Sequence, residues 1–471
     1  MSQFGVIGLA TMGMNLALNV ERNGFKTSVF NRTTSKTEAF ETSHGDKNIV
    51  FAKTLEQFVS SLERPRKILL MVKAGNAVDS FIDKLLPLIE NGDIVIDGGN
   101  SFYKDSDRRF NLLQPLGIHF VGLGISGGEL GALYGPSLMA GCSVEAWKSL
   151  KPILEAIAAN APQDQRPCVG HFGPKGSGHL VKTVHNGIEY GLLQLLAEAY
   201  DLMRKIANMS ADKISDVFQK WNEGPLKSYL VEISVVVLKK KLDDIPTKNV
   251  VDIILDKAGA KGTGAWTSQI GFDAGYPIPT INIATSTRSV SSFKDVRTKL
   301  ASKRVETPVE RMSPEVLVPM LEKALLTSFL CCYVQGMDML AEVCKESGYG
   351  TDMTQVAAVW RNGCIIRSEF LLQELTDAYT RNPSISHLLL DNRINELISE
   401  GVPYLRRIVP NAVLSGIPLP ALSSILTYYE AMHTENLPAN FIQGLRDLFG
   451  AHTYKRLDKN TEENFHTEWY S

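Results

Sequence analysis

The chain has 471 residues, of which 44% are hydrophobic, and this is enough for two or three domains that each bury a core. Its 49 Lys and Arg nearly balance its 51 Asp and Glu, so the formal net charge of −2 gives no overall basic excess that would favour nucleic acid or an anionic membrane. The six cysteines form no Cys-x-x-Cys pair and no zinc-finger cluster with histidine, which favours buried reduced thiols and no metal site. The N-terminus lacks the basic start of a secretion signal, and long apolar runs are absent, so we expect a cytoplasmic protein without a membrane span.

Residues 1–176 alternate short apolar runs with helical stretches. The strand candidates all end in small or polar residues, and they are FGVIGL, TSVFNR, KILLMVKAG, DIVIDGGN and IHFVGLGISGG. Such alternation predicts an α/β domain of the Rossmann type, built on a parallel doubly wound sheet.

The first strand candidate runs into a tight turn and a helix, as a dinucleotide-binding fingerprint requires. Gly8 permits the turn, Ala10 stands where a second glycine usually lets the pyrophosphate approach, and Gly13 allows close helix packing. A plain glycine-rich turn is the alternative. The position of the motif between two strands favours the dinucleotide site.

Asn31, Arg32 and Thr33 follow the second strand candidate, where an NAD enzyme normally carries an acid for the ribose hydroxyl. An arginine at this place suits a 2′-phosphate, so the predicted cofactor is NADP. The alternative is a surface arginine that binds no ligand.

Residues 177–434 consist mainly of long helical segments and predict a second, all-helical domain. Within it FQKWNEGPLKSYLVEI (218–233) and AVWRNGCIIRSEFLLQEL (358–375) look alike, and Trp221 and Gly224 match Trp360 and Gly363 at a spacing of 139. This indicates a weak internal duplication or a chance similarity. Residues 435–471 look too irregular to form a core, so we expect this C-terminal tail to lie on a neighbour.

The stretch 176–194 is a predicted helix with two faces. Its apolar residues share one arc, which is the expected core face: Leu180, Val181, Val184, Ile188 and Leu192. Its polar residues share the opposite arc: Lys182, His185, Asn186, Glu189 and Tyr190. Such a polar stripe usually faces solvent, and this is the alternative interpretation. Short amides, imidazoles and a phenol beside glycines at 176, 178, 187 and 191 instead favour the close approach of a ligand.

Several long motifs resemble those of one family nearly end to end. They are GLATMG, NRT, VKAG (72–75), IDGGNS (96–101), ISGGE (125–129), GPSLMAG, KTVHNGIEYG (182–191), DKAGAKGTGAWT (256–267), WRNGCIIR (360–367) and ENLPANFIQGLRDLFGAHTY (435–454). The family is the decarboxylating 6-phosphogluconate dehydrogenases of the pentose phosphate pathway. The resemblance implies an NADP-dependent homodimer with a shared active site, whose helical domain contains a duplication and whose tail threads into the other subunit.

The resemblance also implies roles for individual residues. Lys182 and Glu189 would be the acid–base pair. The substrate, 6-phosphogluconate, would be held by Asn100, Ser126, Gly127, Gly128, His185, Asn186, Tyr190, Lys261, Thr263 and Arg288, with Arg446 and His452 from the partner subunit. The residues around NADP would be Gly8, Ala10, Gly13, Asn31, Arg32, Thr33, Val72, Lys73, Ala74 and Asn100. Ordinary turn formers are the alternative for the glycine-rich segments, and solvated cations for Arg288.

The chemistry agrees with this pair. A 3-keto acid loses carbon dioxide because its carbonyl accepts the electrons, so no metal is required. A lysine whose pKa is lowered toward neutrality by desolvation can take the C3 hydroxyl proton and return it to the carbonyl oxygen. Glu189 is seven residues further along the same face, ~10 Å along the helix, where it can protonate C1 of the enediol.

Two other functions stay open. A 3-hydroxy acid dehydrogenase that does not decarboxylate is disfavoured by the tail and KGTG motifs. A silent NADP-binding sensor is disfavoured because Lys182 and Glu189 are both present. The chain departs from the family pattern at four places, which leave the pair intact and bear on the fine structure around the substrate pocket: Leu130, Leu133, Leu192 and Ala265.

Overall fold

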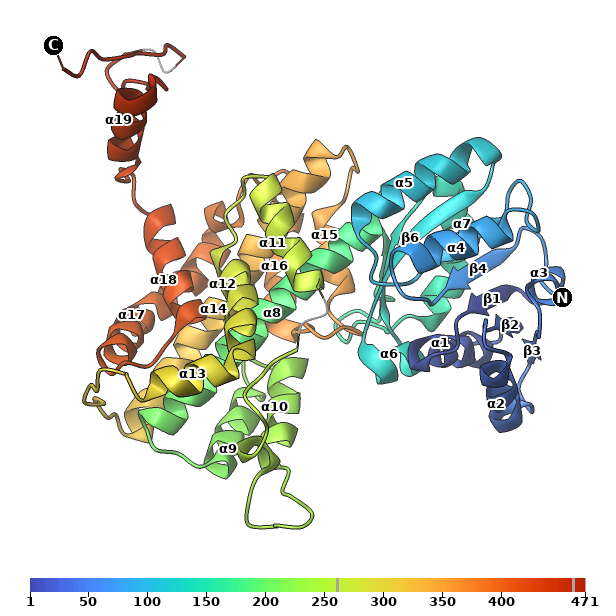
Figure 1. Cartoon of the computed structure of the whole chain (residues 1–471), viewed down its shortest axis with the longest axis horizontal. Helices are drawn as coiled ribbons and strands as arrows, with labels where there is room; N and C mark the ends of the chain where they lie inside the picture. The colour runs from blue at the N-terminus through green and yellow to red at the C-terminus, as the bar shows by residue number, and fades with distance from the viewer. Residues whose placement is uncertain (260–261, 460–461, 471) are drawn as a thin grey trace.

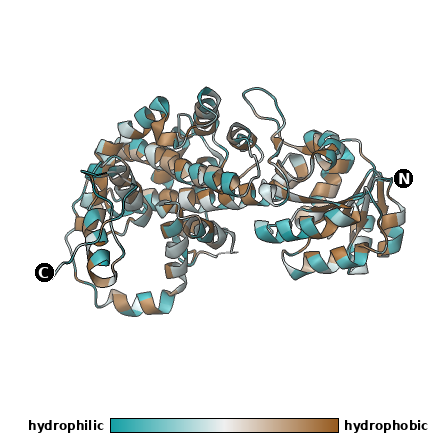
Figure 2. Cartoon of the chain, turned by 90° about the horizontal axis from the view of Figure 1, so that it is seen from above, coloured by the Kyte–Doolittle hydropathy of each residue, from teal (hydrophilic) through white to brown (hydrophobic). Residues whose placement is uncertain are grey.

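The computed structural model of the chain describes residues 1–259, 262–459 and 462–470. These residues form an α/β body near the N-terminus and a helical body, from which the C-terminal helix stands away (Figure 1). The two termini lie at opposite ends of the molecule in both views (Figures 1 and 2). The predicted domain boundary at 176/177 falls between the last strand, which ends at His171, and the long helix α8 (Ser177–Lys205).

The α/β body is built on one sheet, in which the described residues form eight strands in the order β3-β2-β1-β4-β5-β6-β7-β8. The predicted strands are β1, β2, β4, β5 and β6. Their runs FGVI, KILL and IVID are buried at every position, as expected for strands covered on both faces. In Figure 2 the hydrophobic colour gathers on these strands, while the surrounding helices carry both colours. The strands are β1 (Phe4–Ile7), β2 (Thr27–Phe30), β3 (Ile49–Phe51), β4 (Lys67–Leu70), β5 (Ile94–Asp97), β6 (His119–Ser126), β7 (Ser137–Gly141) and β8 (Val169–His171).

The sheet is of the predicted parallel, Rossmann type, with one antiparallel pair near an edge. Strands β1 to β6 are parallel, but β7 pairs antiparallel with β6, and β8 pairs parallel with β7. Only residues 127–136 connect β6 to β7, which is too short for the crossover that a parallel partner needs. The strands β3, β7 and β8 were not predicted, because runs such as IVF and VGH are too short to show a pattern.

Helices cover both faces of the sheet. One apolar cluster includes Leu16, Leu150 and Ile153, and a second includes Phe58 and Ile82. The helices of this body are α1 (Thr11–Arg22), α2 (Thr34–His44), α3 (Leu55–Ser60), α4 (Asn76–Leu85), α5 (Tyr103–Leu113), α6 (Gly128–Tyr134) and α7 (Val144–Ile157), with a 3₁₀ turn at Gln114–Leu116.

The helical body is organised around α8 and α14, which pack against each other. Among the described residues α14 is the one helix long and apolar enough to cross a membrane, but 72% of its apolar window is buried within the protein. It is therefore a core helix. The helices of this body are α8, α9 (Ala211–Trp221), α10 (Tyr229–Lys239), α11 (Thr263–Asp273), α12 (Pro279–Ser292), α13 (Lys294–Ala301), α14 (Pro314–Glu346), α15 (Met353–Val359), α16 (Glu369–Arg381), α17 (Asn392–Leu414) and α18 (Pro420–Met432), with 3₁₀ turns at Val250–Asp252 and Leu388–Leu390.

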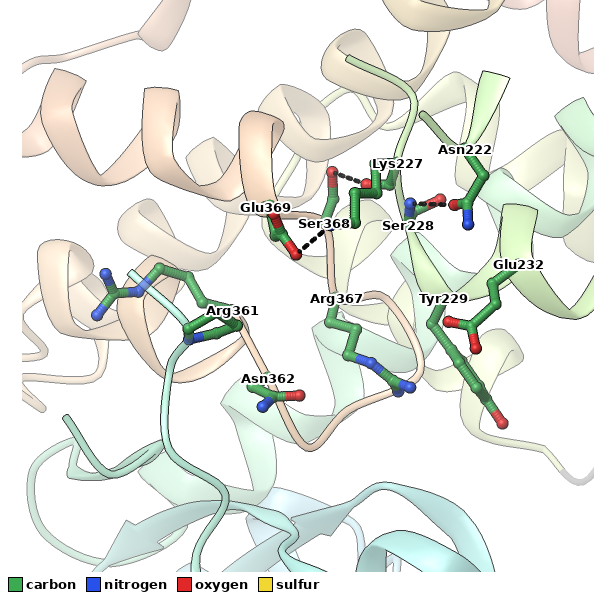
Figure 3. Close-up of a pocket in the computed structure, with 11 residues that line it drawn as sticks. Asn222, Lys227, Ser228, Tyr229, Glu232, Arg361, Asn362, Arg367, Ser368 and Glu369 are labelled. Carbon is green, nitrogen blue, oxygen red and sulfur yellow. Dashed lines mark hydrogen bonds and ion pairs between the residues drawn. The ribbon is translucent and has the colours of Figure 1, made fainter. Parts of the chain in front are cut away.

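The two similar sequence segments meet in space. Ser228 precedes α10 and Ser368 precedes α16, and these two residues form an antiparallel β-bridge. The Tyr229 amide donates to the carbonyl of Arg367, and the Ser368 hydroxyl donates to the carbonyl of Lys227. Figure 3 shows this junction. The duplicated loops thus hold the two halves of the helical body together.

A second pair of segments extends the repeat. GYPIP (275–279) leads into α12 and GIPLP (416–420) leads into α18, and each helix begins at its second proline. Gly275 and Gly416 have φ values of +60° and +65°. The helices α12 and α18 also pack against each other. The sequence analysis missed this motif, although it has the same spacing to within two residues.

The tail contains a regular helix, α19 (Ala439–Gly450), which the sequence did not lead us to expect. Its fold depends on the buried carboxylate of Asp447, which accepts hydrogen bonds from the amides of Thr453 and Thr467 and from the indole of Trp469. A polar hub therefore replaces an apolar core in this segment.

Candidate active site

The turn after β1 has the geometry that a dinucleotide site requires. Gly8 has a φ of +102°, and a Cβ there would lie 2.3 Å from the carbonyl oxygen of Met71. A Cβ on Gly13 would lie 1.9 Å from the carbonyl oxygen of Gly8. Both positions therefore exclude any side chain. Ala10 is the N-cap of α1 and provides no side-chain cap, and the first turn has no acid, so its N–H groups are available to an anion.

The end of β2 presents a cation where an acid would select NAD. The Asn31 side chain closes this turn, because its Oδ1 accepts from the Leu9 amide at 3.0 Å and its Nδ2 donates to the Thr33 carbonyl at 3.1 Å. Arg32 is exposed beside it. A helix N-terminus for the pyrophosphate and an arginine for a 2′-phosphate together fit NADP.

A cleft of about 790 Å³ lies between the two bodies. Its wall includes the predicted acid–base pair, most of the residues predicted for the substrate and part of the set predicted for NADP: Val72, Lys73, Ala74, Asn100, Ser126, Gly127, Gly128, Lys182, Asn186, Glu189, Tyr190, Thr263 and Arg288. The tertiary structure thus brings together segments that are more than 200 residues apart. Lys261, also predicted here, lies outside the described residues.

Lys182 is buried at the wall of this cleft, with 6% of its surface exposed. Its Nζ donates to Asn186 Oδ1 at 2.7 Å and lies 3.2 Å from His185 Nδ1. Burial lowers the pKa of Lys182 to about 8, against the opposing effect of the negative charge of Glu189. About a tenth of Lys182 is therefore neutral at pH 7, far more than for an ordinary lysine.

His185 is placed differently from the prediction. It is fully buried and is absent from the wall of the cleft among the described residues. Burial and the neighbouring Lys182 charge hold the pKa of His185 well below its usual range, so the ring is neutral. Its Nδ1 faces Lys182, and its Nε2 lies 3.2 Å from the Ser126 hydroxyl. A ring that accepts at Nδ1 and donates at Nε2 satisfies both contacts. His185 thus supports two wall residues from behind.

The other end of the cleft is aromatic and cationic. The Arg288 guanidinium lies over the ring of Tyr190, 3.4 Å from its centroid. Gly264 packs against the same ring, where a Cβ would approach to 2.4 Å. Burial raises the pKa of Glu189, although the charges of Lys182 and Arg288 oppose this rise. The described part of the wall thus runs from a buried amine, past a carboxyl group, to a phenol and a guanidinium.

The glycines at the start of α8 and within it were predicted to let a ligand approach, but the structure gives a different reason for them. Cβ atoms on Gly176, Gly178, Gly187 and Gly191 would collide with Tyr103, Met139, Thr267 and Cys332 respectively, each within 2.4 Å. Neighbouring protein, and no ligand, approaches the helix at these points. Four residues of the polar arc are nevertheless buried and Glu189 is half-buried, and the apolar arc lies in the core as predicted.

Comparison with known proteins gives the family. The model for the NAD binding domain of 6-phosphogluconate dehydrogenase matches residues 3–173, and the model for the C-terminal domain of 6-phosphogluconate dehydrogenase matches residues 178–469. The chain belongs to the 6-phosphogluconate dehydrogenase family.

Relatives within this family match over their whole length. The 6-phosphogluconate dehydrogenase, decarboxylating, of Lactococcus lactis is 48% identical over 100% of this chain and 99% of its own. The NADP(+)-dependent, decarboxylating enzyme of Bacillus subtilis is 48% identical over 99% of both chains. The solved 6-phosphogluconate dehydrogenase of Plasmodium falciparum, studied with NADP+ and with 6-phosphogluconate, superposes with a TM-score of 0.94 at 42% identity, over 99% of this chain and 100% of its own.

The departures from the 6-phosphogluconate dehydrogenase pattern lie off the cleft. Leu192 is buried in the core, Leu130 and Ala265 are exposed, and none of the four departing residues belongs to the described wall. Their bearing on the fine structure around the pocket therefore stays a prediction. The sequence analysis also missed wall residues that carry no titratable group: Met12, Ile125, Gly259, Trp266 and Ile365. The signal for all five was their place inside the quoted motifs.

Proposed function

We infer that this chain catalyses the oxidative decarboxylation of 6-phosphogluconate to ribulose 5-phosphate and carbon dioxide, with reduction of NADP. The observation that carries this function is the buried Lys182 amine beside Asn186, in one cleft with Glu189 and with the Tyr190–Arg288 pair. Bound NADP supplies the acceptor for the hydride from C3 of the substrate.

The residues of this chain supply the proton transfers. Neutral Lys182 takes the proton of the C3 hydroxyl and, as an ammonium, returns a proton to the C3 carbonyl oxygen while carbon dioxide leaves. Asn186 holds Nζ through its side-chain oxygen, and His185 stays neutral and does not compete for the proton. Glu189, whose pKa is raised by burial, then delivers a proton to C1 of the enediol. Arg288 and Tyr190 suit the phosphate at the far end.

One assay tests this function against its alternatives. Purified protein is given 6-phosphogluconate with NADP or NAD, and reduced cofactor and released carbon dioxide are measured together. We expect equal amounts of both products with NADP. Reduced cofactor without carbon dioxide would assign a non-decarboxylating 3-hydroxy acid dehydrogenase. NADP binding without turnover would assign a sensor.

Arg32 is proposed to read the 2′-phosphate of NADP, because it is exposed at the end of β2 where no acid stands. Arg32→Ala should weaken NADP binding by about 1.5–3 kcal/mol, as for a lost charge-assisted contact, and should leave NAD binding nearly unchanged. The dissociation constants of both cofactors check this. Equal losses would show that Arg32 does not contact the 2′-phosphate.

We further propose a cytoplasmic homodimer in which each tail completes the partner's active site. The tail helix exposes large apolar side chains: Phe441, Ile442, Leu445, Leu448 and Phe449. A stable monomer rarely exposes such a surface. The helix α19 projects from the helical body (Figure 1). Arg446 belongs to α19 and His452 follows it, and neither is in the described wall of the chain's own cleft. The six free buried cysteines agree with a reducing compartment.

Deletion of residues 435–471 tests the shared site. We expect the truncated chain to lose activity and to shift toward monomer, as measured by light scattering. A matched variant, Arg446→Ala, should stay dimeric and bind 6-phosphogluconate more weakly. A truncated monomer with full activity would disprove the shared site.

A further inference from the structure

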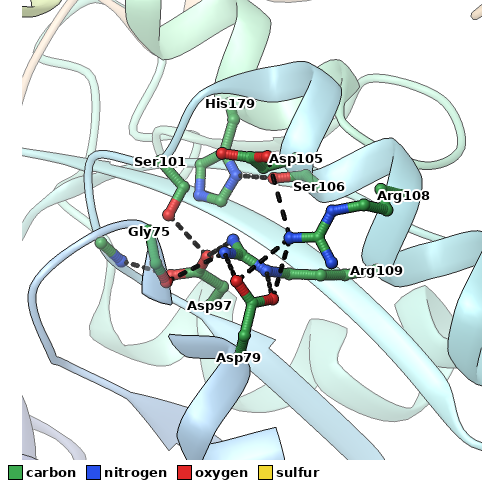
Figure 4. Close-up of polar contacts among 10 residues, drawn as sticks. Gly75, Asp79, Asp97, Ser101, Asp105, Ser106, Arg108, Arg109 and His179 are labelled. Carbon is green, nitrogen blue, oxygen red and sulfur yellow. Dashed lines mark hydrogen bonds and ion pairs between the residues drawn. The ribbon is translucent and has the colours of Figure 1, made fainter. Parts of the chain in front are cut away.

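A buried charge network lies directly behind the cleft, in the α/β body. Arg109 on α5 is completely buried, and its guanidinium contacts three separate elements (Figure 4). Nε donates to Asp79 on α4 at 2.8 Å, Nη1 donates to Asp97 at the end of β5 at 3.1 Å, and Nη2 donates to the Gly75 carbonyl at 3.1 Å. One side chain thus connects the carboxyl ends of two neighbouring strands.

The Gly75 carbonyl closes the loop that presents Val72, Lys73 and Ala74 to the cleft. Gly75 has a φ of +88° and is the N-cap of α4. Its carbonyl oxygen also accepts the amide of Val78 at 2.9 Å. Arg109 is therefore the side-chain anchor for the end of this loop.

Asp97 shapes the second loop, residues 98–101, which presents Asn100 to the cleft. Its Oδ1 accepts the Gly99 amide at 3.0 Å, and its Oδ2 accepts the Ser101 hydroxyl at 2.6 Å as well as Arg109. A Cβ on Gly99 would lie 3.2 Å from both this carboxylate and the Val72 carbonyl, so the two loops touch. The Arg109–Asp97 contact sets their relative position.

Stability alone does not explain the buried ion pairs of Arg109. A buried ion pair adds little net stability over a well-packed apolar pair, because desolvation offsets its Coulomb attraction. A guanidinium, by contrast, has N–H groups that point in fixed directions, so it can hold a carbonyl and two carboxylates in a defined arrangement. An apolar pair cannot do this. On the same helix Ser106 lies 2.6 Å from Nδ1 of His179, one turn before Lys182 on α8. The helix α5 therefore connects both loops to the catalytic helix.

We propose that Arg109 is a positioning residue, which holds the 72–75 and 98–101 loops in the mutual arrangement that binds NADP and orients the substrate. This role rests on the proposed function, because both loops are assigned to that site.

The test compares two buried arginines that form ion pairs at opposite ends of the neighbouring strands β4 and β5. Arg66 precedes β4 and pairs with Asp93, which precedes β5, at 2.6 Å, so this pair lies at the opposite ends of the strands from Arg109. Arg109→Lys and Arg66→Lys each keep the charge and lose the fork. We measure the melting temperature without ligand, the dissociation constant for NADPH by fluorescence, and kcat and KM for 6-phosphogluconate.

We expect both variants to lose stability, and Arg109→Lys alone to weaken NADPH binding and to lower kcat by about 10- to 100-fold, as for displaced groups. Ser101→Ala, which removes one loop contact and leaves the ion pairs intact, should show a smaller change of the same kind if Arg109→Lys does not fold. Equal NADPH binding and kcat in the two arginine variants would overturn the proposal. If Arg109→Lys does not fold, a Ser101→Ala variant identical to wild type would overturn it instead. A wild-type protein that binds NADPH but does not oxidise 6-phosphogluconate would refute the proposed function, while the NADPH comparison would still test Arg109.

Discussion

The two longest helices, α8 and α14, are equivalent in the internal repeat, but only α8 carries the proposed catalytic residues. The helices α8 and α14 are 29 and 33 residues long, occupy corresponding places in the two halves of the helical body, and are mostly buried. At the repeat spacing of 139, the polar arc of α8 corresponds to Leu321, Ala324, Leu325, Ser328 and Phe329 of α14. All five are buried, and four are apolar.

The difference between the two helices shows that the active site requires titratable side chains beside the cleft, in addition to a well-packed helix. Helix packing tolerates either set of side chains, because both helices are surrounded by protein. Only α8 faces the cleft with a titratable amine and a carboxyl group, and burial shifts their pKa values toward each other. Substitutions at corresponding positions of the two helices should therefore have different effects.

The largest difference is expected at the position of Lys182. Lys182→Met keeps the length of the side chain and removes its titratable amine, so it should lower both NADP reduction and carbon dioxide release by about 10²- to 10⁴-fold. Leu321→Met on α14 is the control, and it should cost less than about 1.5 kcal/mol of stability and leave kcat unchanged. Similar activity in the two variants would remove the distinction between the helices.

The reverse pattern is expected at Phe329 on α14. Phe329→Ala leaves a cavity in the core and should lower the free energy of unfolding by about 3–5 kcal/mol. Its kcat, measured well below the melting temperature, should stay close to that of wild type, because Phe329 is not a wall residue. Denaturant unfolding and steady-state kinetics check the two parts. A large loss of kcat in a folded variant would show that α14 also positions the site.

Glu189 and Ser328 form the third comparison. Glu189→Gln should still reduce NADP at first and should slow the exchange of solvent hydrogen at C1 of the pentulose product by about 10²-fold, as for a lost general acid. Proton exchange is the cleaner measurement, because slow product release can mask this step in turnover. Ser328→Ala should change neither quantity. Exchange at the wild-type rate in the glutamine variant would make Glu189 structural.

The smallest effect concerns pH. Burial lowers the pKa of Lys182 to about 8, so its neutral, base form decreases about tenfold per pH unit below that value, and kcat/KM should fall accordingly as the pH is lowered. The charge of Glu189 raises the pKa of Lys182, so Glu189→Gln should move the inflection to lower pH. A pH–rate profile of both proteins measures the shift. An inflection that stays in place would show that the two side chains are not coupled.

The order of the two domains and the helix α8 could be predicted from the sequence, because the patterns that indicate them lie within short stretches of the chain. Alternating apolar runs marked β1, β4 and β5, and the 3.6-residue period separated the core arc of α8 from Lys182 and Asn186. Gly13 was interpretable for the same reason, since a side chain there would collide with the carbonyl oxygen of Gly8 in the same turn. The partner that excludes a side chain at Gly8 is the carbonyl oxygen of Met71, which is distant in the chain, so only the spacing of the fingerprint indicated that glycine.

Other features depend on partners that are distant in the chain, and no local pattern shows them. Gly187 faces Thr267 of α11 and not a ligand, and His185 lies behind the wall, where it contacts Ser126 from another domain.

The sequence by itself determined which residues can transfer protons or bind charged groups, because side-chain type and helical spacing can be read from a short stretch of the chain. Only the tertiary structure decided which of them act together. Burial beside the cleft brings Lys182 to a pKa of about 8, and the approach of α12 places Arg288 on Tyr190, nearly 100 residues away along the chain. Desolvation and contact are properties of packed neighbours, so they appear only when the chain has folded.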